Sequence, residues 1–416
     1  MKLISNNFEK NGLFSEPDGT SSDQVINWPS QINNHFLKDV QYIRVLFDYG
    51  EPWTIDCDPF KYLKPESLNN LRDRKCIFVF DNSMEGWSPI ECPVVIALHN
   101  SALKYQIDLR KIYYLTSNHL EYTCYANFLF LNNISVGINI LQSTMISDMV
   151  LPREYEPSDH HQTKFLENHK DKFFLHLSRR NRPHRVLANY LMSKSEIKND
   201  GYLSQDKLRR RDVNSILNVS NESPNLINKL TVDDIKEWNR ELPYVVDSDD
   251  FEVNWASYRS EDLYHKTVFS IVLETNVNDR GGTTMFPSEK TFKAIIHKHP
   301  FMIFGNRGIN SFLKSLGFKT YESYFNIDSF DFETDPVSRY LKIKDISTHT
   351  VNHLKKLTIE QRCQWRFQFQ DILDYNYNLL VSGILKKNEF EKLHQTIYSY
   401  FSNDFYNYLN TKISPN

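Results

Sequence analysis

The sequence predicts an α/β protein of two Rossmann-like domains that face each other across a cleft, followed by a helical C-terminal tail. The chain has 416 residues, more than a single core requires, which favours two domains. Both halves contain short apolar runs that end in Asp, Asn, Gly or Ser, as buried strands of a parallel sheet do. Stretches with helical spacing separate these runs. A ligand is therefore expected at the carboxyl ends of the strands, in the cleft.

The first 160 residues divide into a polar leader, predicted over 1–40, and an N-terminal α/β domain, predicted over 41–160. Short runs rich in β-branched and aromatic residues predict the strands of this domain, at 42–50, 76–83, 92–100 and 111–118. The stretch 65–74 has the pattern of a short helix between two of them.

The second half repeats the α/β pattern. Residues 151–170 are polar, contain two prolines and are predicted to be a linker to a C-terminal domain over 170–345. Within that domain, 196–260 is polar and is interpreted as an insertion. Strands are predicted at 172–178, 270–276 and 300–306, and helices at 183–194, 291–299 and 309–318, the last ended by Gly317. This order indicates a parallel sheet. Residues 346–416 are predicted to form a tail of helices.

Composition narrows the classes of function. The net charge of −3 gives no overall basic field for nucleic acid or an anionic membrane, although a local basic patch stays open. The five cysteines are scattered and contain no Cys-x-x-Cys pair, which argues against a zinc site or a disulfide framework and favours a reducing compartment. No apolar run has the length of a signal peptide or of a membrane span. We therefore expect a cytoplasmic protein without a transmembrane segment.

The stretch "SRRNRPHR" (178–185) is the first candidate binding motif. It follows a predicted strand, opens a predicted helix and holds four arginines in eight residues. Free N–H groups at a helix start and the forked donors of arginine both suit phosphate oxygens. Arg185, in the first helical turn, is the best single candidate for anion binding. The alternative is a solvated basic loop.

The stretch "IVLETNVNDRGGTTMFPSEKTFKAI" (271–295) is the second candidate. A strand is expected to end at Glu274-Thr275, and Ser288 can cap a helix whose first turn holds Glu289 and Lys290. A lysine in the first turn opposes the helix dipole, which hints at an anionic ligand. A carboxylate beside it can accept both hydroxyls of a ribose. The alternative is an ordinary solvated charge pair.

Carboxylates after strands of the N-terminal domain are candidates for a general base. Asp81 and Glu85 lie in "FDNSMEGW" (80–87), at the end of a predicted strand, and Asp48 and Glu51, at the end of the preceding strand, are rivals. Capping of a loop by the carboxylate is an equally good interpretation. Acidic triplets at 56–58, 247–249 and 331–333, and the "DHH" run at 159–161, raise the question of a metal. Chance explains them in a chain with 52 acidic residues, and no metal is predicted.

Together, "SRRNRPHRVLANYL", "VLETN", "FPSEKTFKAI", "HPFMIFGNRG" and "LKSLGFKTYESYF" resemble the donor-binding half of the α1,3-fucosyltransferase-like glycosyltransferases. The resemblance covers about 172–325 and implies the GT-B fold, in which the C-terminal domain binds a nucleotide sugar and the N-terminal domain receives the acceptor. The loop between Glu274 and Glu289 is longer than in that family, and Thr275 stands where the family prefers Asn. The family's tyrosine just before the Glu-Lys pair is here Phe286 or Pro287.

The resemblance also implies roles. Arg185 and Lys290 would hold the donor diphosphate, Glu289 the ribose, and Thr275 would lie near the nucleotide or the sugar. The full donor-binding set is Asn181, Arg182, Arg185, Glu274, Thr275, Glu289 and Lys290. By analogy the donor is linked to GDP, as in GDP-fucose, and no further cofactor is expected. The catalytic base of the family is an N-terminal carboxylate, for which Glu85 and then Asp81 are the candidates.

The resulting expectation is an inverting, metal-independent glycosyltransferase that moves a sugar from a nucleotide-sugar donor to a hydroxyl of a glycan or other acceptor. Two alternatives stay open. One is a nucleotide-binding module of the same fold without catalytic activity. The other is a glycosyltransferase that acts on a hydroxylated base in DNA, for which the basic run "DKLRRRD" (206–212) is the only support.

Overall fold

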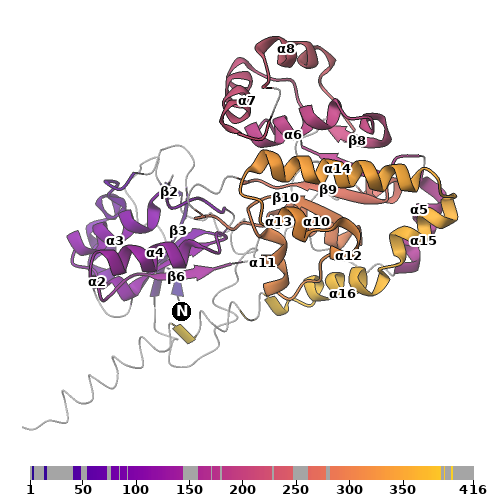
Figure 1. Cartoon of the computed structure of the whole chain (residues 1–416). Helices are drawn as coiled ribbons and strands as arrows, with labels where there is room; N and C mark the ends of the chain where they lie inside the picture. The colour runs from indigo at the N-terminus through magenta and orange to yellow at the C-terminus, as the bar shows by residue number, and fades with distance from the viewer. Residues whose placement is uncertain are drawn as a thin grey trace, which may run out of the picture. The chain divides into compact units, whose positions relative to one another are not determined.

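The computed structural model consists of two compact units (Figure 1). The first unit comprises Met1–Ile146, Arg280–Thr284 and Ile384–Asn416, and the second comprises Ser147–Asp279 and Met285–Gly383. The structure describes residues 2–3, 14–15, 41–47, 54–72, 76–83, 85–90, 92–143, 158–169, 171–178, 180–226, 229–246, 261–277, 282–385, 388 and 395–396. Each unit is an α/β structure with its own largely parallel sheet, as predicted.

The sheet of the first unit has the order β1-β3-β4-β5-β6, with β2 paired to β3. All pairs are parallel except that between β2 and β3. The strands are β1 (Lys2–Leu3), β2 (Phe14–Ser15), β3 (Gln41–Phe47), β4 (Cys76–Asn82), β5 (Ile112–Thr116) and β6 (Asn139–Gln142). Three of the predicted strands are therefore present. The short β1 and β2 come from 1–40, which sequence analysis assigned to a polar leader.

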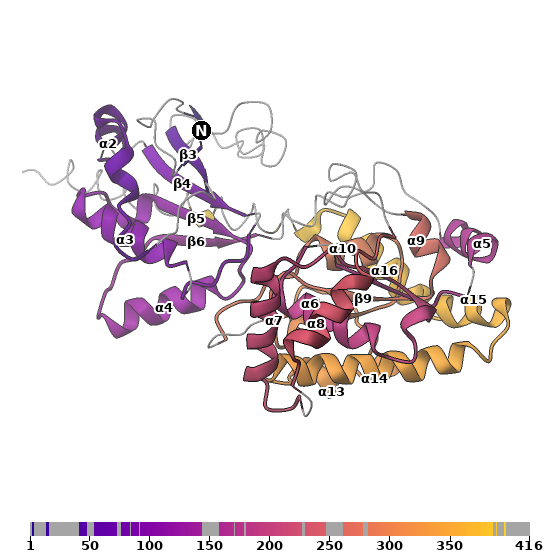
Figure 2. The same cartoon turned by 90° about the horizontal axis from the view of Figure 1, so that it is seen from above.

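Helices cover one face of this sheet (Figure 2). They are η2 (Pro59–Tyr62), α2 (Pro65–Arg72), α3 (Val94–Lys104), η3 (Leu109–Lys111) and α4 (Glu121–Leu131). Alternate residues of β4, namely Cys76, Phe78 and Phe80, pack with α3 and with Ile112 and Tyr114 of β5 in one apolar core. The intervening residues of β4 are buried as well. Because β4 is buried on both faces, its sequence is an almost continuous apolar run.

One predicted strand is wrong. The run at 92–100 lies in and just before helix α3, Val94–Lys104, rather than in a strand. Seven residues of α3 are buried, including Val94, Val95 and Leu98. A helix buried on most of its surface shows a continuous apolar run, and periodicity alone does not separate it from a buried strand. β4 and β5 are therefore direct neighbours in the sheet, and α3 is the crossover between them.

The second unit has a four-stranded parallel sheet in the order β10-β9-β7-β8. Its strands are β7 (Phe174–Leu177), β8 (Gly201–Ser204), β9 (Phe269–Leu273) and β10 (Phe301–Phe304). In Figure 1, β9 and β10 run between α14 (Pro336–Leu354) on one side and α10 (Glu289–Ile296) on the other. The remaining elements are α5 (Ser158–Asn168), α6 (Pro183–Ser193), η5 (Lys198–Asp200), α7 (Arg210–Glu222), α8 (Val232–Glu241), α9 (Glu261–Lys266), α11 (Ile309–Ser315), α12 (Glu322–Phe325), α13 (Asp328–Asp331), α15 (Ile359–Phe367) and α16 (Gln370–Val381).

The predicted strands and helices of this unit are present, but three of its boundaries differ from the prediction. β8 lies inside 196–260, so part of the expected insertion is an edge strand of the sheet. Helix α5 lies inside the expected linker. Helix α14 runs across the expected start of the tail at 346 and packs on α6 and β10. The helices α15 and α16 of the expected tail also belong to the second unit.

Candidate functional site

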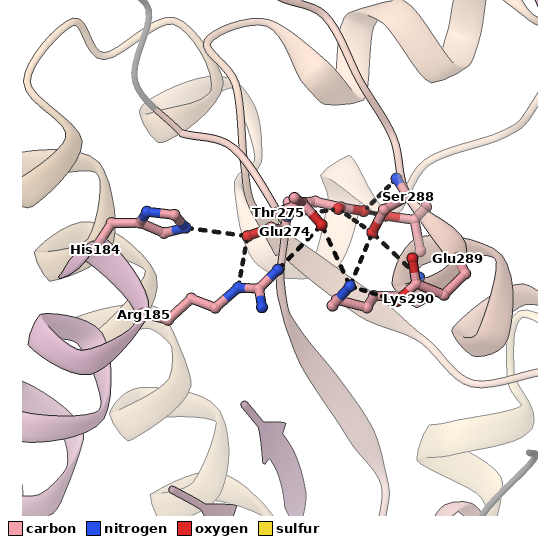
Figure 3. A network of polar contacts seen from close by, with 8 residues as sticks. His184, Arg185, Glu274, Thr275, Ser288, Glu289 and Lys290 are labelled. Atoms are coloured by element: carbon pink, nitrogen blue, oxygen red, sulfur yellow. Dashed lines mark hydrogen bonds and ion pairs between the residues drawn. The ribbon is translucent and has the colours of Figure 1, made fainter. Parts of the chain in front are cut away.

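The residues of both binding motifs meet at the carboxyl ends of β7 and β9 (Figure 3). Helix α6 follows β7 and supplies His184 and Arg185, whereas Glu274 and Thr275 directly follow β9. The start of α10 supplies Ser288, Glu289 and Lys290. Residues 90 positions apart in the chain are thus linked by hydrogen bonds, as between Arg185 and Thr275. The site is contained within the second unit.

The Glu274 carboxylate connects the end of β9 to the start of α10. It is fully buried, and its Oε1 accepts hydrogen bonds from Ser288 N (3.0 Å) and Thr291 Oγ1 (2.6 Å). Its Oε2 accepts from Thr275 N (3.0 Å) and from the Ser288 hydroxyl. Gly305, directly after β10, makes room for this side chain, because an added Cβ would lie 3.1 Å from the Glu274 side chain. The geometry gives Glu274 an anchoring role, and donor binding by it stays a prediction.

Helix α10 begins as the sequence predicts. Ser288 is its N-cap, with extended backbone, and its side chain accepts from Lys290 N at 3.4 Å. Glu289 and Lys290 consequently lie in the first turn. A serine at this position satisfies one of the N–H groups that a helix start leaves without an intrahelical partner.

Glu289 and Lys290 form a close ion pair, with 2.5 Å between Oε1 and Nζ. The two side chains are 20% and 27% exposed, so both reach the surface in part. Burial acts to raise the pKa of Glu289, but the charge and hydrogen bond of Lys290, together with the charges of Lys293 and Arg185, outweigh it and lower that pKa to about 2. Burial lowers the pKa of Lys290, and the charge of Glu289 opposes that shift. The Glu289 carboxylate is therefore ionised at neutral pH.

Arg185 approaches from the opposite side and is only 2% exposed. Its Nε donates to Glu274 O at 2.9 Å and its Nη2 to Thr275 Oγ1 at 3.1 Å. Burial lowers the pKa of Arg185 to about 10, which leaves the guanidinium charged at neutral pH. Burial and the charge of Arg185 lower the pKa of His184 to about 3. Since Glu274 O only accepts, the neutral His184 donates to it from Nε2, at 3.1 Å.

The Thr275 hydroxyl is the point where the two cations converge. Besides the hydrogen bond from Arg185, its Oγ1 accepts from Lys290 Nζ at 3.3 Å. Lys290 Nζ also lies 3.4 Å from Ser288 Oγ. Two cations from different helices thus share one neutral oxygen, and an anionic oxygen can replace the hydroxyl as their common acceptor.

Asn181 and Arg182 flank this centre in different ways. Asn181 donates from Nδ2 to Lys207 O (2.9 Å) and Asp212 Oδ2 (3.0 Å), and its Oδ1 accepts from Gln205 at 2.5 Å. These bonds make Asn181 a brace of the loop before α6. Arg182 occupies the N-cap position of α6 and is half-buried. After burial, its charge is the next largest cause of the lowered pKa of Arg185, so the two guanidinium groups lie close together.

The candidate bases lie in the first unit: Asp81 is the second-last residue of β4, and Glu85 follows that strand. Asp81 is buried, and its Oδ1 accepts from the backbone N (3.0 Å) and the hydroxyl (2.6 Å) of Ser83. This is a loop-capping contact of the kind that sequence analysis kept as the alternative. Glu85 is half-buried, and its backbone N donates to Asn82 O at 3.1 Å. Their rivals Asp48 and Glu51 lie outside the described residues.

Sequence analysis missed a third carboxyl group of the first unit, Glu121. It opens α4, just after β5, and is 2% exposed. Burial raises its pKa to about 8. Asn118 donates to Glu121 Oε2 at 3.2 Å and to Trp87 O at 2.9 Å, which connects the end of β5 to the loop that carries Glu85. The signal in the sequence was a Glu at the start of a helix, five residues after the end of a strand.

The acidic triplets are engaged in ordinary contacts where they are described. Asp58 accepts from Ser101 (2.5 Å) and Lys104 (2.5 Å), and Asp331 from Asn310 (2.8 Å) and Ser311 (3.0 Å). The triplet at 247–249 lies outside the described residues. Within the described part of the chain, no three His, Cys, Asp or Glu side chains are grouped so that they could hold a metal ion.

Comparison with known proteins adds no relative. No protein-family model matches the chain, and no curated protein matches it either. Among the described helices, none combines the length and the apolar character needed to cross a membrane. The indications of function are therefore the residues of the site and the resemblance in 172–325.

Proposed function

We propose that the second unit binds the diphosphate and ribose of a nucleotide sugar, and that the protein is a glycosyltransferase with a GT-B arrangement of its two units. The observation that carries the proposal is the convergence of Arg185 and Lys290 on the Thr275 hydroxyl, at the carboxyl edge of a parallel sheet. Nucleotides commonly bind at this edge of open α/β sheets. The proposed location is the cytoplasm.

The chemistry of the residues suits a diphosphate. The guanidinium of Arg185 offers forked donors, and Lys290 adds a compact charge at the start of α10, where the helix dipole also favours an anion. Both groups already lie in hydrogen-bonding positions, so little side-chain entropy is lost on binding. The Glu289 carboxylate, ionised beside Lys290, suits the two hydroxyls of a ribose. A GDP-linked donor such as GDP-fucose is the first candidate.

In the proposed reaction, a first-unit carboxylate takes the proton of the acceptor hydroxyl. Glu85 is the first candidate and Asp81 the second. The acceptor oxygen then bonds to the anomeric carbon while the bond from that carbon to the diphosphate breaks, which inverts the configuration. Arg185 and Lys290 offset the negative charge that grows on the leaving nucleoside diphosphate, without a metal ion. The acceptor is proposed to be a glycan or another hydroxyl compound.

Thermal unfolding with nucleoside diphosphates tests the binding step. A ligand present at about 100 times its dissociation constant stabilises the native state by about 2.7 kcal/mol. We expect GDP or another nucleoside diphosphate to raise the melting temperature of the wild-type protein by several degrees. Lys290→Met keeps the apolar stem but removes the charge, and should abolish most of this shift. Lys236→Met, an exposed lysine of α8, is the matched control and should retain it.

Thermal shifts and donor turnover can also contradict the proposal. If GDP, UDP, CDP, ADP and their sugars all leave the wild-type melting temperature unchanged, the second unit is no nucleotide site. If nucleotides bind but no sugar is transferred or hydrolysed, the protein is a binding module. Donor turnover that is lost in Glu85→Gln, with the nucleotide shift intact, speaks for catalysis and for that base.

A further inference from the structure

Two basic loops leave the sheet of the second unit side by side. One follows β7 and contains Arg180 and Arg182, and the other follows β8 and contains Lys207 and Arg209–Arg211. β7 and β8 are parallel neighbours, paired up to Leu177 and Ser204. Their carboxyl ends therefore lie on the same edge of the sheet, about 4.8 Å apart. We call these six side chains the cationic row: Arg180, Arg182, Lys207, Arg209, Arg210 and Arg211.

Asn181 fastens the two loops to each other. Its side chain donates to Lys207 O and Asp212 Oδ2 and accepts from Gln205 Nε2. The same Asp212 oxygen accepts from Arg209 N at 2.8 Å. All three partners of Asn181 lie in the loop after β8 or at the start of α7. The two basic loops are thus held as one surface.

Cationic side chains outnumber acidic ones within the two basic loops. Within 180–182 and 206–212, six cationic side chains face two acidic ones, Asp206 and Asp212. Asp212 is buried and committed to Asn181 and to the start of α7, and its Oδ1 is 3.8 Å from Arg211 Nε. Lys207, Arg209, Arg210 and Arg211 are exposed. The surface therefore has a positive potential that an anionic partner can neutralise.

The positions of these cations run against local preference. Arg209 is the N-cap of α7, with Arg210 and Arg211 in its first turn, and Arg182 is the N-cap of α6. A cation at a helix N-terminus lies at the positive end of the helix dipole, where it is unfavourable. Asp212 offsets part of this in α7, but the first turn of α6 contains no acidic residue. Two adjacent helix starts with this arrangement indicate a surface adapted to an anion rather than to stability.

The cationic row also continues the proposed diphosphate site. Arg185 lies one turn beyond Arg182 in α6, and the charges of Arg182 and Arg180 contribute to the lowered pKa of Arg185. From Lys290 after β9, the cations extend past β7 to β8, the edge strand. A line of cations across three neighbouring strands is longer than one nucleoside diphosphate needs.

We propose that the cationic row binds the phosphodiester backbone of a single-stranded nucleic acid, which presents the acceptor hydroxyl to the donor site. The acceptor role rests on the proposed function, whereas the binding itself does not. Arginine forks match phosphate oxygens, and a line of cations matches a strand of repeating phosphates. A membrane surface fits less well, because the described residues between 171 and 226 include no large exposed apolar side chain.

The test measures binding of a labelled single-stranded oligonucleotide of about twelve nucleotides by fluorescence anisotropy at several salt concentrations. The variant Arg209→Gln/Arg210→Gln/Arg211→Gln removes three exposed charges. We expect its affinity to fall at least tenfold. Its slope of log K against log salt should become shallower by about two, since each phosphate contact contributes about 0.7 for single strands.

A matched control removes three exposed lysines elsewhere on the second unit, in Lys236→Gln/Lys355→Gln/Lys356→Gln. It should bind the oligonucleotide as the wild-type protein does. The arginine variant should keep the thermal shift with nucleoside diphosphate that Lys290→Met loses, which separates this inference from the proposed function. Equal oligonucleotide affinity of wild type and arginine variant overturns the inference. So does an equal loss in the lysine control, or binding of anionic lipid vesicles with no binding of the oligonucleotide.

Discussion

At the scale of single residues, the half-buried Glu289 and the buried Glu121 show how the surroundings decide the ionisation of a carboxyl group. Glu289 has a cation at 2.5 Å, and its pKa falls to about 2 in spite of burial. Glu121 accepts a hydrogen bond from the neutral Asn118, and burial raises its pKa to about 8. Desolvation acts in the same direction on both, so the cations near Glu289, Lys290 first among them, make the difference. Residue type alone predicts neither value.

Glu121 makes the stability of the first unit depend on pH. Its carboxyl ionises near pH 4.5 when unfolded but only near pH 8 when folded. Its contribution to stability is thus fully present below about pH 4.5 and is lost as the pH rises towards 8, by up to about 1.4 kcal/mol per pH unit. Glu121→Gln removes this penalty. We expect the variant to gain about 2–4 kcal/mol relative to wild type between pH 5 and pH 8 in denaturant titrations.

The exposed Glu66 of α2, replaced by Gln in the same way, is the control. Its free energy of unfolding relative to wild type should change far less over the same range. A difference between Glu121→Gln and wild type that is the same at pH 5 and pH 8 would contradict the assigned shift.

At the scale of elements, the start of α10 shows how a helix is fixed in place by a residue from another element. Ser288 caps the helix locally. Glu274, from the end of β9, binds Ser288 and Thr291 across the sheet edge. The cap was readable from the sequence because it involves neighbours in the chain. The anchor was not, because fourteen residues separate Glu274 from Ser288.

Glu274→Gln separates this anchoring role from ligand binding. The amide places an NH2 group among donors, so buried hydrogen bonds are lost at a cost of about 2–4 kcal/mol. We expect a lower free energy of unfolding in urea together with a lost nucleotide shift. Glu289→Gln, on the partly exposed side chain, should lose nucleotide affinity with little change in stability. If Glu274→Gln has wild-type stability but no nucleotide binding, Glu274 is a ligand instead of an anchor.

At the scale of the whole molecule, the second unit contains buried histidines between α5, α9 and the end of α10. His161 and His265 lie with Nδ1 and Nε2 3.4 Å apart, and His299 contacts Thr267 and Ser270. The fully buried Arg366 of α15 donates to the carbonyls of Tyr264 and Thr267. Burial first, and then the charge of Arg366, lower the pKa of His161 to about 3 and that of His265 to about 4.

These histidines predict acid instability of the second unit. The unfolded chain takes up protons below about pH 6.5, while the folded unit keeps His161 and His265 neutral to about pH 3–4. The contribution of these histidines to the free energy of unfolding is therefore fully present above pH 6.5. It falls with decreasing pH by about 1.4 kcal/mol per pH unit for each histidine. His161→Gln should reduce the pH dependence of the free energy of unfolding, measured by calorimetry between pH 6 and pH 4, by the contribution of one histidine, about 1.4 kcal/mol per pH unit. An unchanged slope would count against this, and the exposed His160→Gln is the control.

Much of the fold was predictable because its signals are local. The run in β4, Pro183 at the start of α6, the Ser288 cap and Gly317, which has a φ of +96° after α11, are all where the sequence indicates. The failures have physical causes. α3 is buried on most of its surface and lacks a helical stripe, and β8 has only four residues. β1 and β2 have two residues each, too few for any periodicity.

For the site, the sequence by itself determined the residue types, the order of strand and helix, and the first turn of α10 with Glu289 and Lys290. The tertiary structure decided what those residues do. It brought Arg185 and Lys290 to one hydroxyl, made Glu274 an anchor, buried Glu121 and joined the basic loops through Asn181. Caps and turns depend on neighbours in the chain and can be read along it. Burial, charge pairing and shared hydrogen bonds depend on neighbours in space, which only the packed sheets bring together.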